Sequence, residues 1–95
     1  MNIVFNELAV LEFKDAVDYY HLQVSGLGEI FSEEIRKALR SIKIHPDAWP
    51  SERGDIKKFI LHKFPYKILY SIESDYIYII AIAHQHRKPE YWTER

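Results

Sequence analysis

The segment YIYIIAIA, residues 76–83, constrains the fold of this chain more than any other segment. It contains no charged residue, and apolar or aromatic side chains occupy its odd and even positions alike. A strand with this pattern is buried on both faces, so it needs neighbouring strands at its sides and cover above and below. A membrane helix would need about 20 such residues. The segment therefore predicts the central strand of a small sheet.

Two helical patterns precede this segment. Apolar residues at positions 9, 13, 16, 17 and 20 repeat with the spacing of one helix face, and Asn6 is a suitable N-cap before them. A second set, at positions 31, 35, 38, 39 and 42, follows the glycines at 26 and 28. It must end by Pro46, because proline disfavours helix in the residue before it. So short a connection predicts an antiparallel helical hairpin.

Shorter strand patterns flank the hairpin, at residues 3–5, 56–63 and 67–72, with a turn at 73–75. The predicted order is β-αα-βββ. An amphipathic hairpin needs an apolar sheet face, so the fold class is α+β: a small, mainly antiparallel sheet with the N-terminal hairpin packed on one face. We expect the opposite face to be open to a partner or substrate. The length of 95 residues predicts a single domain over residues 1–95.

Composition excludes several classes of function. The chain has no cysteine, which excludes disulfides and thiolate metal sites and favours a reducing, cytoplasmic setting. No signal peptide or membrane span is expected. The net charge of −1 predicts no general affinity for nucleic acid, but the lysines between residues 57 and 67 are not interrupted by an acid. They predict a local positive surface. His84-x-His86 lacks a third local ligand for zinc, so no metal or cofactor is predicted.

The most specific pattern lies in the C-terminal part. FPYKILYSI, residues 64–72, is followed by YIYIIAIAHQHRKPEYWTER, residues 76–95. Together they resemble the RelE/ParE superfamily of toxins from bacterial type II toxin–antitoxin pairs, in particular the branch called plasmid stabilisation proteins. The residues that match its pattern are Phe64, Pro65, Tyr66, Tyr70, His84, Arg87, Pro89, Tyr91 and Trp92. DAVDYY, residues 15–20, and LGEIFSEEI, residues 27–35, also fit, so the resemblance covers nearly the whole chain.

The resemblance implies a growth-inhibiting toxin that a cognate antitoxin binds and neutralises in a hetero-oligomer. Some members of the superfamily inhibit DNA gyrase without hydrolysing a substrate, and others cleave mRNA on the ribosome. The ending Pro89-x-Tyr91-Trp92 is more similar to the non-nuclease branch, so ParE-like inhibition of gyrase is the leading expectation. A RelE-like, ribosome-dependent mRNA endonuclease is the first alternative. An inactive remnant that only binds its antitoxin is the second, and whether the chain is an enzyme stays open.

Candidate site residues follow from the same stretch. RNA cleavage by a 2′-hydroxyl needs a base, an acid and positive charge on the phosphorane. For that alternative the candidate catalytic residues are His84, His86, Arg87 and Tyr91. The candidates for binding a target or an antitoxin are Lys63, Lys67, Arg87, Lys88, Tyr91 and Trp92. His84 alone could equally be a strand-end histidine whose ring bonds a backbone carbonyl.

Overall fold

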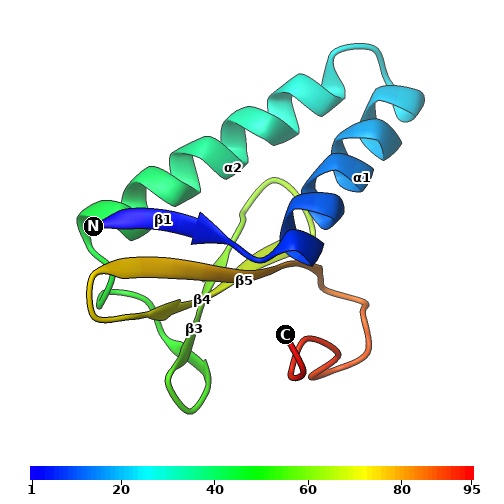
Figure 1. The fold of residues 1–95 in the computed structure, drawn as a ribbon. Coiled ribbons are helices and arrows are strands. Elements are labelled where there is room, and N and C mark those ends of the chain that lie inside the picture. Colours follow the sequence, from blue (N-terminus) through cyan, green and yellow to red (C-terminus); the bar gives the residue numbers. More distant parts are fainter.

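The computed structural model describes all 95 residues, as two helices and five strands (Figure 1). The elements are β1 (Asn2–Phe5), α1 (Glu7–Gln23), α2 (Leu27–Ile44), β2 (Ser51–Arg53), β3 (Ile56–Ile60), β4 (Tyr66–Ile72) and β5 (Tyr76–His84). The α+β class and the helical hairpin are confirmed. The short strand β2 was not predicted from the sequence. Its residues lie between a proline and a glycine and show no strand pattern. No helix is both long and apolar enough to cross a membrane.

The sheet has the strand order β1-β5-β4-β3-β2, and only the β1–β5 pair is parallel. Strand β5 is therefore paired on both sides, as its sequence predicts. Its register against β4 sets Leu69 opposite Ala81 but Tyr70 opposite Ile79, which leaves Ile80 as an additional residue. Such a bulge interrupts the alternation of side chains between faces. It lies beside the candidate site described below.

Both helices cover the same face of the sheet (Figure 1), and the main core fills the space between the two layers. Phe31 of α2 is at its centre, with ring centroids 5.3 Å from Tyr20 and 5.1 Å from both Phe64 and Tyr66. Fully buried aliphatic residues of β4 and β5 complete the core, and each contributes roughly 1.5–3 kcal/mol by leaving water. These residues are Ile68, Ile77, Ile79 and Ile82.

Two local features fix the hairpin. The Asn6 side chain accepts a hydrogen bond from the Leu8 N–H at 2.8 Å and donates one to the Tyr78 hydroxyl at 2.9 Å. The N-cap of α1 is thereby tied to β5. At the other end, a Cβ on Gly28 would lie 2.6 Å from the His21 ring and 2.6 Å from the Val17 carbonyl oxygen. The hydrogen of glycine is what lets the two helices approach so closely there.

The face opposite the helices, called here the front face, is not fully open as expected. The C-terminal segment, residues 85–95, turns back across it (Figure 1). Trp92 of this segment is only 6% exposed, because it packs on a second cluster formed by Leu69, Ile80, Ala81 and Ala83. The physical reason is the apolar pattern of residues 76–83: a strand that is apolar on both faces needs cover on both.

Candidate functional site

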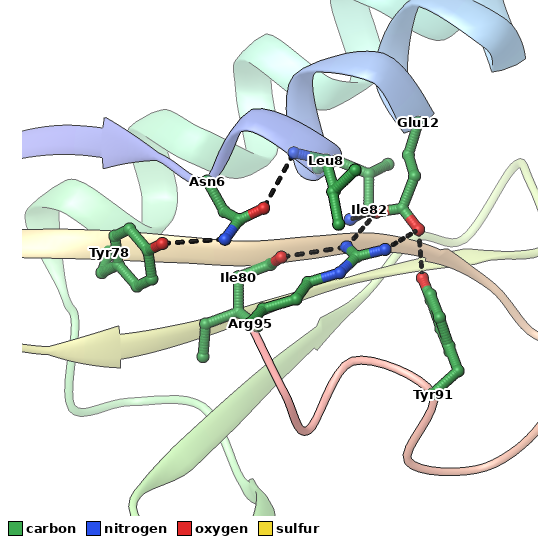
Figure 2. Close-up of polar contacts among 8 residues, drawn as sticks. All are labelled: Asn6, Leu8, Glu12, Tyr78, Ile80, Ile82, Tyr91 and Arg95. Carbon is green, nitrogen blue, oxygen red and sulfur yellow. Dashed lines mark hydrogen bonds and ion pairs between the residues drawn. The ribbon is translucent and has the colours of Figure 1, made fainter.

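The carboxylate of Glu12, on α1, forms hydrogen bonds with both the C-terminal segment and the end of β5 (Figure 2). Glu12 accepts hydrogen bonds from the Ile82 backbone N–H at 3.1 Å and from the Tyr91 hydroxyl at 2.5 Å. The Arg95 guanidinium donates two more to it, at 2.7 and 3.0 Å. The side chains of Arg95 and Glu12 are only 9% and 15% exposed. We call Glu12, Ile80, Ile82, Tyr91 and Arg95 the Glu12 network.

The place of this network follows from the unequal lengths of two strands. Strand β1 ends at Phe5, opposite Ile79, whereas β5 continues to His84. Beyond Ile79 the outer edge of β5 has no strand partner, and unpaired backbone groups in a buried setting are costly. Arg95 donates to the Ile80 carbonyl at 3.1 Å, and Glu12 accepts from the Ile82 N–H. The two side chains therefore satisfy the backbone groups that a longer β1 would have paired.

The network also holds the Tyr91 phenol in its protonated form. Burial raises the pKa of Tyr91 far above its ordinary value, and the hydrogen bond and charge of Glu12 raise this pKa further. The Arg87 guanidinium lies over the Tyr91 ring, 3.9 Å from its centroid, and Arg95 lies 5.0 Å from it. Such cation–π contacts of two arginines help to hold the ring in place. Tyr91 is thus a hydrogen-bond donor whose hydroxyl is already in use inside the protein.

The two histidine rings lie together at the end of β5. Strand β5 ends at His84, and a turn rather than a continued strand brings the His86 ring to 5.1 Å from the His84 ring. His84 Nδ1 accepts a hydrogen bond from the His86 backbone N–H at 3.0 Å instead of donating to a carbonyl. Burial lowers the pKa of His84, and neighbouring His86 lowers it further. His84 is therefore neutral at pH 7, with its proton on Nε2.

Acids from elsewhere in the chain partly neutralise the positive surface predicted between residues 57 and 67. Lys67 contacts both oxygens of Glu52 at 2.9 Å, and Lys58 lies 3.9 Å from the same carboxylate. Lys63 lies 3.9 Å from Glu34. These acids come from β2 and α2, so they could not be seen in the local run of lysines. Two acids face three of the four lysines, so this surface is less positive than the lysines alone would make it.

A cleft of about 190 Å³ gathers most of the predicted site residues. Its lining includes Lys67, His84, Arg87, Lys88, Tyr91 and Trp92. His86 and Lys63 do not line it. An exposed ion pair between Arg53 and Glu90, at 2.8 Å, ties the β2 end to the C-terminal segment. Nowhere in the chain do three His, Asp or Glu side chains gather as a metal site would require.

The sequence did not reveal Glu12, Glu52 and Arg95 as parts of this site. Glu12 looked like one of several acids on a helix surface, and Glu52 lay in a loop-like stretch. Arg95 follows the recognisable motif, so the motif drew no attention to it. One signal could have pointed to Glu12: it is spaced i, i+4 from Ala16, which places it on the helix side that turns toward the sheet. The three residues lie far apart in the sequence.

Comparison with known proteins gives one matching family model and a similar solved structure. The model of a family described as ParE toxin of type II toxin-antitoxin system, parDE, matches residues 3–89. No curated protein sequence is significantly similar. Among solved structures, one described as the chromosomal ParDE TA system from P. aeruginosa is similar, with a TM-score of 0.67 and 16% sequence identity. The alignment covers 88% of this chain and 95% of that one. At this identity the structural similarity supports the fold alone.

Proposed function

This chain belongs to the ParE toxin family of type II toxin–antitoxin systems, and from that premise we propose that it inhibits growth by binding DNA gyrase through protein contacts. A cognate antitoxin binds and neutralises it. In this proposal residues 1–95 form one domain that acts in the cytoplasm. The basic and aromatic residues of the front face form the contact surface for the target or the antitoxin, with Arg87 and Lys88 as its exposed cations.

The observation that supports contact rather than catalysis is the use of the Tyr91 hydroxyl within the fold. A nuclease needs a phenol or imidazole free to exchange a proton with RNA, and a cation free to meet the phosphate. Here the phenol donates to Glu12, and burial together with this carboxylate raises the pKa of Tyr91 far above its ordinary value. Lys67, one of the cations that line the cleft, is paired with Glu52. Two groups that cleavage could use, the Tyr91 phenol and the Lys67 ammonium, are therefore already bound to other groups of the chain.

Ribosome-dependent mRNA cleavage remains the second candidate, because His84, Arg87 and Tyr91 line one cleft. In that mechanism Arg87 would meet the phosphate, while His84 and His86 would exchange protons with the RNA. The third reading, an inactive antitoxin-binding remnant, differs from both because it predicts no effect on growth. The three readings are separated by what happens to cells and to purified targets.

The test is to induce the chain in cells without the antitoxin and to follow growth, DNA-damage signalling and message decay. We expect growth arrest with DNA-damage signalling, and inhibition of supercoiling when purified gyrase is mixed with the purified protein. Rapid loss of translated messages would refute the gyrase proposal in favour of the nuclease. Normal growth at good expression would refute both toxic readings.

One substitution sharpens this comparison. His86 is exposed and its side chain makes no hydrogen bond within the chain, so His86→Gln should leave the fold intact. The gyrase proposal predicts unchanged message stability and retained toxicity in this variant. The nuclease mechanism predicts slower cleavage, typically by a factor of about 10² or more for a lost acid–base group. His62→Gln is the matched control, because His62 is also exposed and does not line the cleft.

A further inference from the structure

A second cavity on the front face lies beside the cleft of the candidate site. It measures about 530 Å³ and lies between residues 53–56 and the C-terminal segment. The residues that line it are Arg53, Gly54, Ile56, Ile80, Trp92, Thr93 and Arg95. We call it the Arg53 pocket. Of the site residues predicted from the sequence it includes only Trp92, which also lines the cleft.

The Arg53 pocket combines apolar side chains with cations and contains no acid. Its apolar lining is Ile56, Ile80 and Trp92. The charge of Arg95 is balanced by Glu12, at 2.7 Å, whereas the Arg53 side chain is 58% exposed. A guanidinium binds a carboxylate through two parallel hydrogen bonds. The lining therefore suits a carboxylate that is carried on an apolar body.

A carboxylate of the chain itself already binds Arg53. Glu90 contacts the guanidinium at 2.8 Å, and both side chains are more than half exposed. An exposed ion pair of this kind contributes little to stability, so another carboxylate can replace Glu90 at little cost. Glu90 lines the neighbouring cleft rather than the pocket, so it leaves the pocket side of Arg53 open.

The backbone of Glu90 is strained. Its φ is +64°, and it is the only residue other than glycine with a positive φ. It follows Pro89 in a turn that the Tyr91 N–H closes by donating to the Lys88 carbonyl at 3.3 Å. This is the pattern of a type II turn, whose third residue is usually glycine because a Cβ disfavours the conformation. The turn alone would favour glycine at position 90, so what the glutamate adds is its carboxylate on Arg53.

We propose that the Arg53 pocket binds an acidic side chain of the target protein together with an apolar neighbour, and that this acid displaces Glu90 from Arg53. The apolar neighbour packs on Ile56 and Trp92. Arginine contacts surrounded by apolar groups often carry much of the affinity of a protein interface. Glu90 acts as an internal competitor that weak partners fail to displace. The identity of the occupant as the target rests on the function proposed above.

The lining favours a protein carboxylate over a nucleic-acid phosphate. A nucleic-acid backbone presents a row of charges, which a protein meets with several cations. Here Arg53 is the one exposed cation of the pocket, and Asp55 in the adjacent turn would repel a polyanion. The apolar side chains beside Arg53 would also gain nothing from a phosphate. A single acid with an apolar neighbour matches this surface better.

The pocket chemistry is tested with 3-phenylpropionate, a carboxylate on an apolar body, and with its neutral amide, 3-phenylpropionamide. The ¹⁵N-labelled protein is titrated with each compound, and backbone amide and arginine Nε–H resonances are followed. We expect the carboxylate to shift resonances of Arg53, Ile56 and Thr93, and to bind at least about threefold tighter than the amide, as one exposed charge contact allows.

Arg53→Met should weaken binding of 3-phenylpropionate by about threefold or more, because it removes that charge contact. Arg40→Met is the matched control, since Arg40 is 62% exposed, is also ion-paired with a glutamate, and does not line the pocket. It should leave the affinity unchanged. Equal affinity for acid and amide, shifts confined to other surfaces, or equal effects of the two arginine variants would overturn the proposal.

Two variants isolate the role of Glu90. Glu90→Gln keeps the size of the side chain and removes its charge, whereas Glu90→Gly also relieves the backbone. Both should tighten binding of 3-phenylpropionate by about two- to fivefold, the value of an exposed ion pair. The Tm of Glu90→Gly should be at least that of Glu90→Gln. Affinity that is unchanged or lower in both variants would refute the displacement of Glu90.

A supercoiling assay separates this proposal from the proposed function. Purified gyrase is mixed with wild type, Arg53→Met or Arg40→Met. Weaker inhibition by Arg53→Met alone supports target binding through the pocket. Inhibition by Arg53→Met equal to that of wild type would refute the pocket as a target contact and leave the gyrase proposal standing. If wild type itself does not inhibit gyrase, the proposed function fails, and the titrations with 3-phenylpropionate still decide whether the pocket binds carboxylates.

Discussion

Replacing Glu12 by glutamine tests whether the Glu12 network stabilises the fold. If the new amide takes the position of Oε2, the contacts of Oε1 with Ile82 and Arg95 remain possible. At the position of Oε2, the contacts with Tyr91 and Arg95 no longer involve a charged oxygen, and the Arg95 N–H loses its acceptor there. Hydrogen bonds to charged groups contribute about 1.5–3 kcal/mol each. Since Tyr91 can still accept a weaker bond from the amide, we expect a loss of about 2–3 kcal/mol in the free energy of unfolding.

The assay is urea unfolding followed by circular dichroism, with a thermal scan as a check. A loss of this size should lower Tm by about 10–20 °C in a domain of this length. Asp18→Asn on the same helix is the control, because Asp18 is exposed and unpaired. It should change the free energy by less than about 0.5 kcal/mol.

A double-mutant cycle with Arg95→Met decides whether the pair itself is responsible. Residues in one ion-pair network couple by about 0.5–3 kcal/mol, whereas independent sites add. We expect coupling of at least about 1 kcal/mol, because Arg95 is 9% exposed and would keep an uncompensated charge beside a neutral amide in the Glu12→Gln single variant. Strictly additive losses, or a Glu12→Gln effect as small as that of the Asp18→Asn control, would refute the argument that these side chains complete the β5 edge.

Three further outcomes follow from the same contacts. Burial and a nearby carboxylate raise the pKa of Tyr70 from 10.0 to about 12, so the neutral phenol stabilises the fold below pH 10. In urea unfolding, the free energy of unfolding should fall by up to roughly 2 kcal/mol between pH 10 and about 12. The fall should be larger in wild type than in Tyr70→Phe. In an NMR titration the pKa of His84 should lie below 6.5, and His86→Ala should raise it without restoring it, because burial is the larger cause; a fully restored value would contradict this order of causes. Gly28→Ala should cost about 1–3 kcal/mol by overpacking against His21, and a neutral result in thermal unfolding would mean that the helices separate freely.

The sequence was sufficient for both helices, for four of the five strands and for the helical layer on the sheet, because local patterns encode them. Periods of about four residues in α1 and α2, and the doubly apolar run in β5, each require a particular partner surface. The motif from Phe64 to Trp92 likewise indicates the superfamily from sequence alone, since its fixed residues lie close together in the chain. The strand β2 was not predicted, because an edge strand of three residues has too few positions to show a pattern.

What only the tertiary structure decided is how charges and hydrogen bonds pair over long separations. The four lysines between residues 57 and 67 predict a positive surface, yet Glu52 and Glu34 lie close to three of them in the fold. Tyr91 read as a possible proton donor for RNA, yet Glu12, 79 positions earlier, holds its hydroxyl. The sequence determines which side chains are apolar and at what period, and burial follows from that directly. A charge finds its partner only after the chain has folded, because the Coulomb interaction depends on distance in space rather than position in the chain.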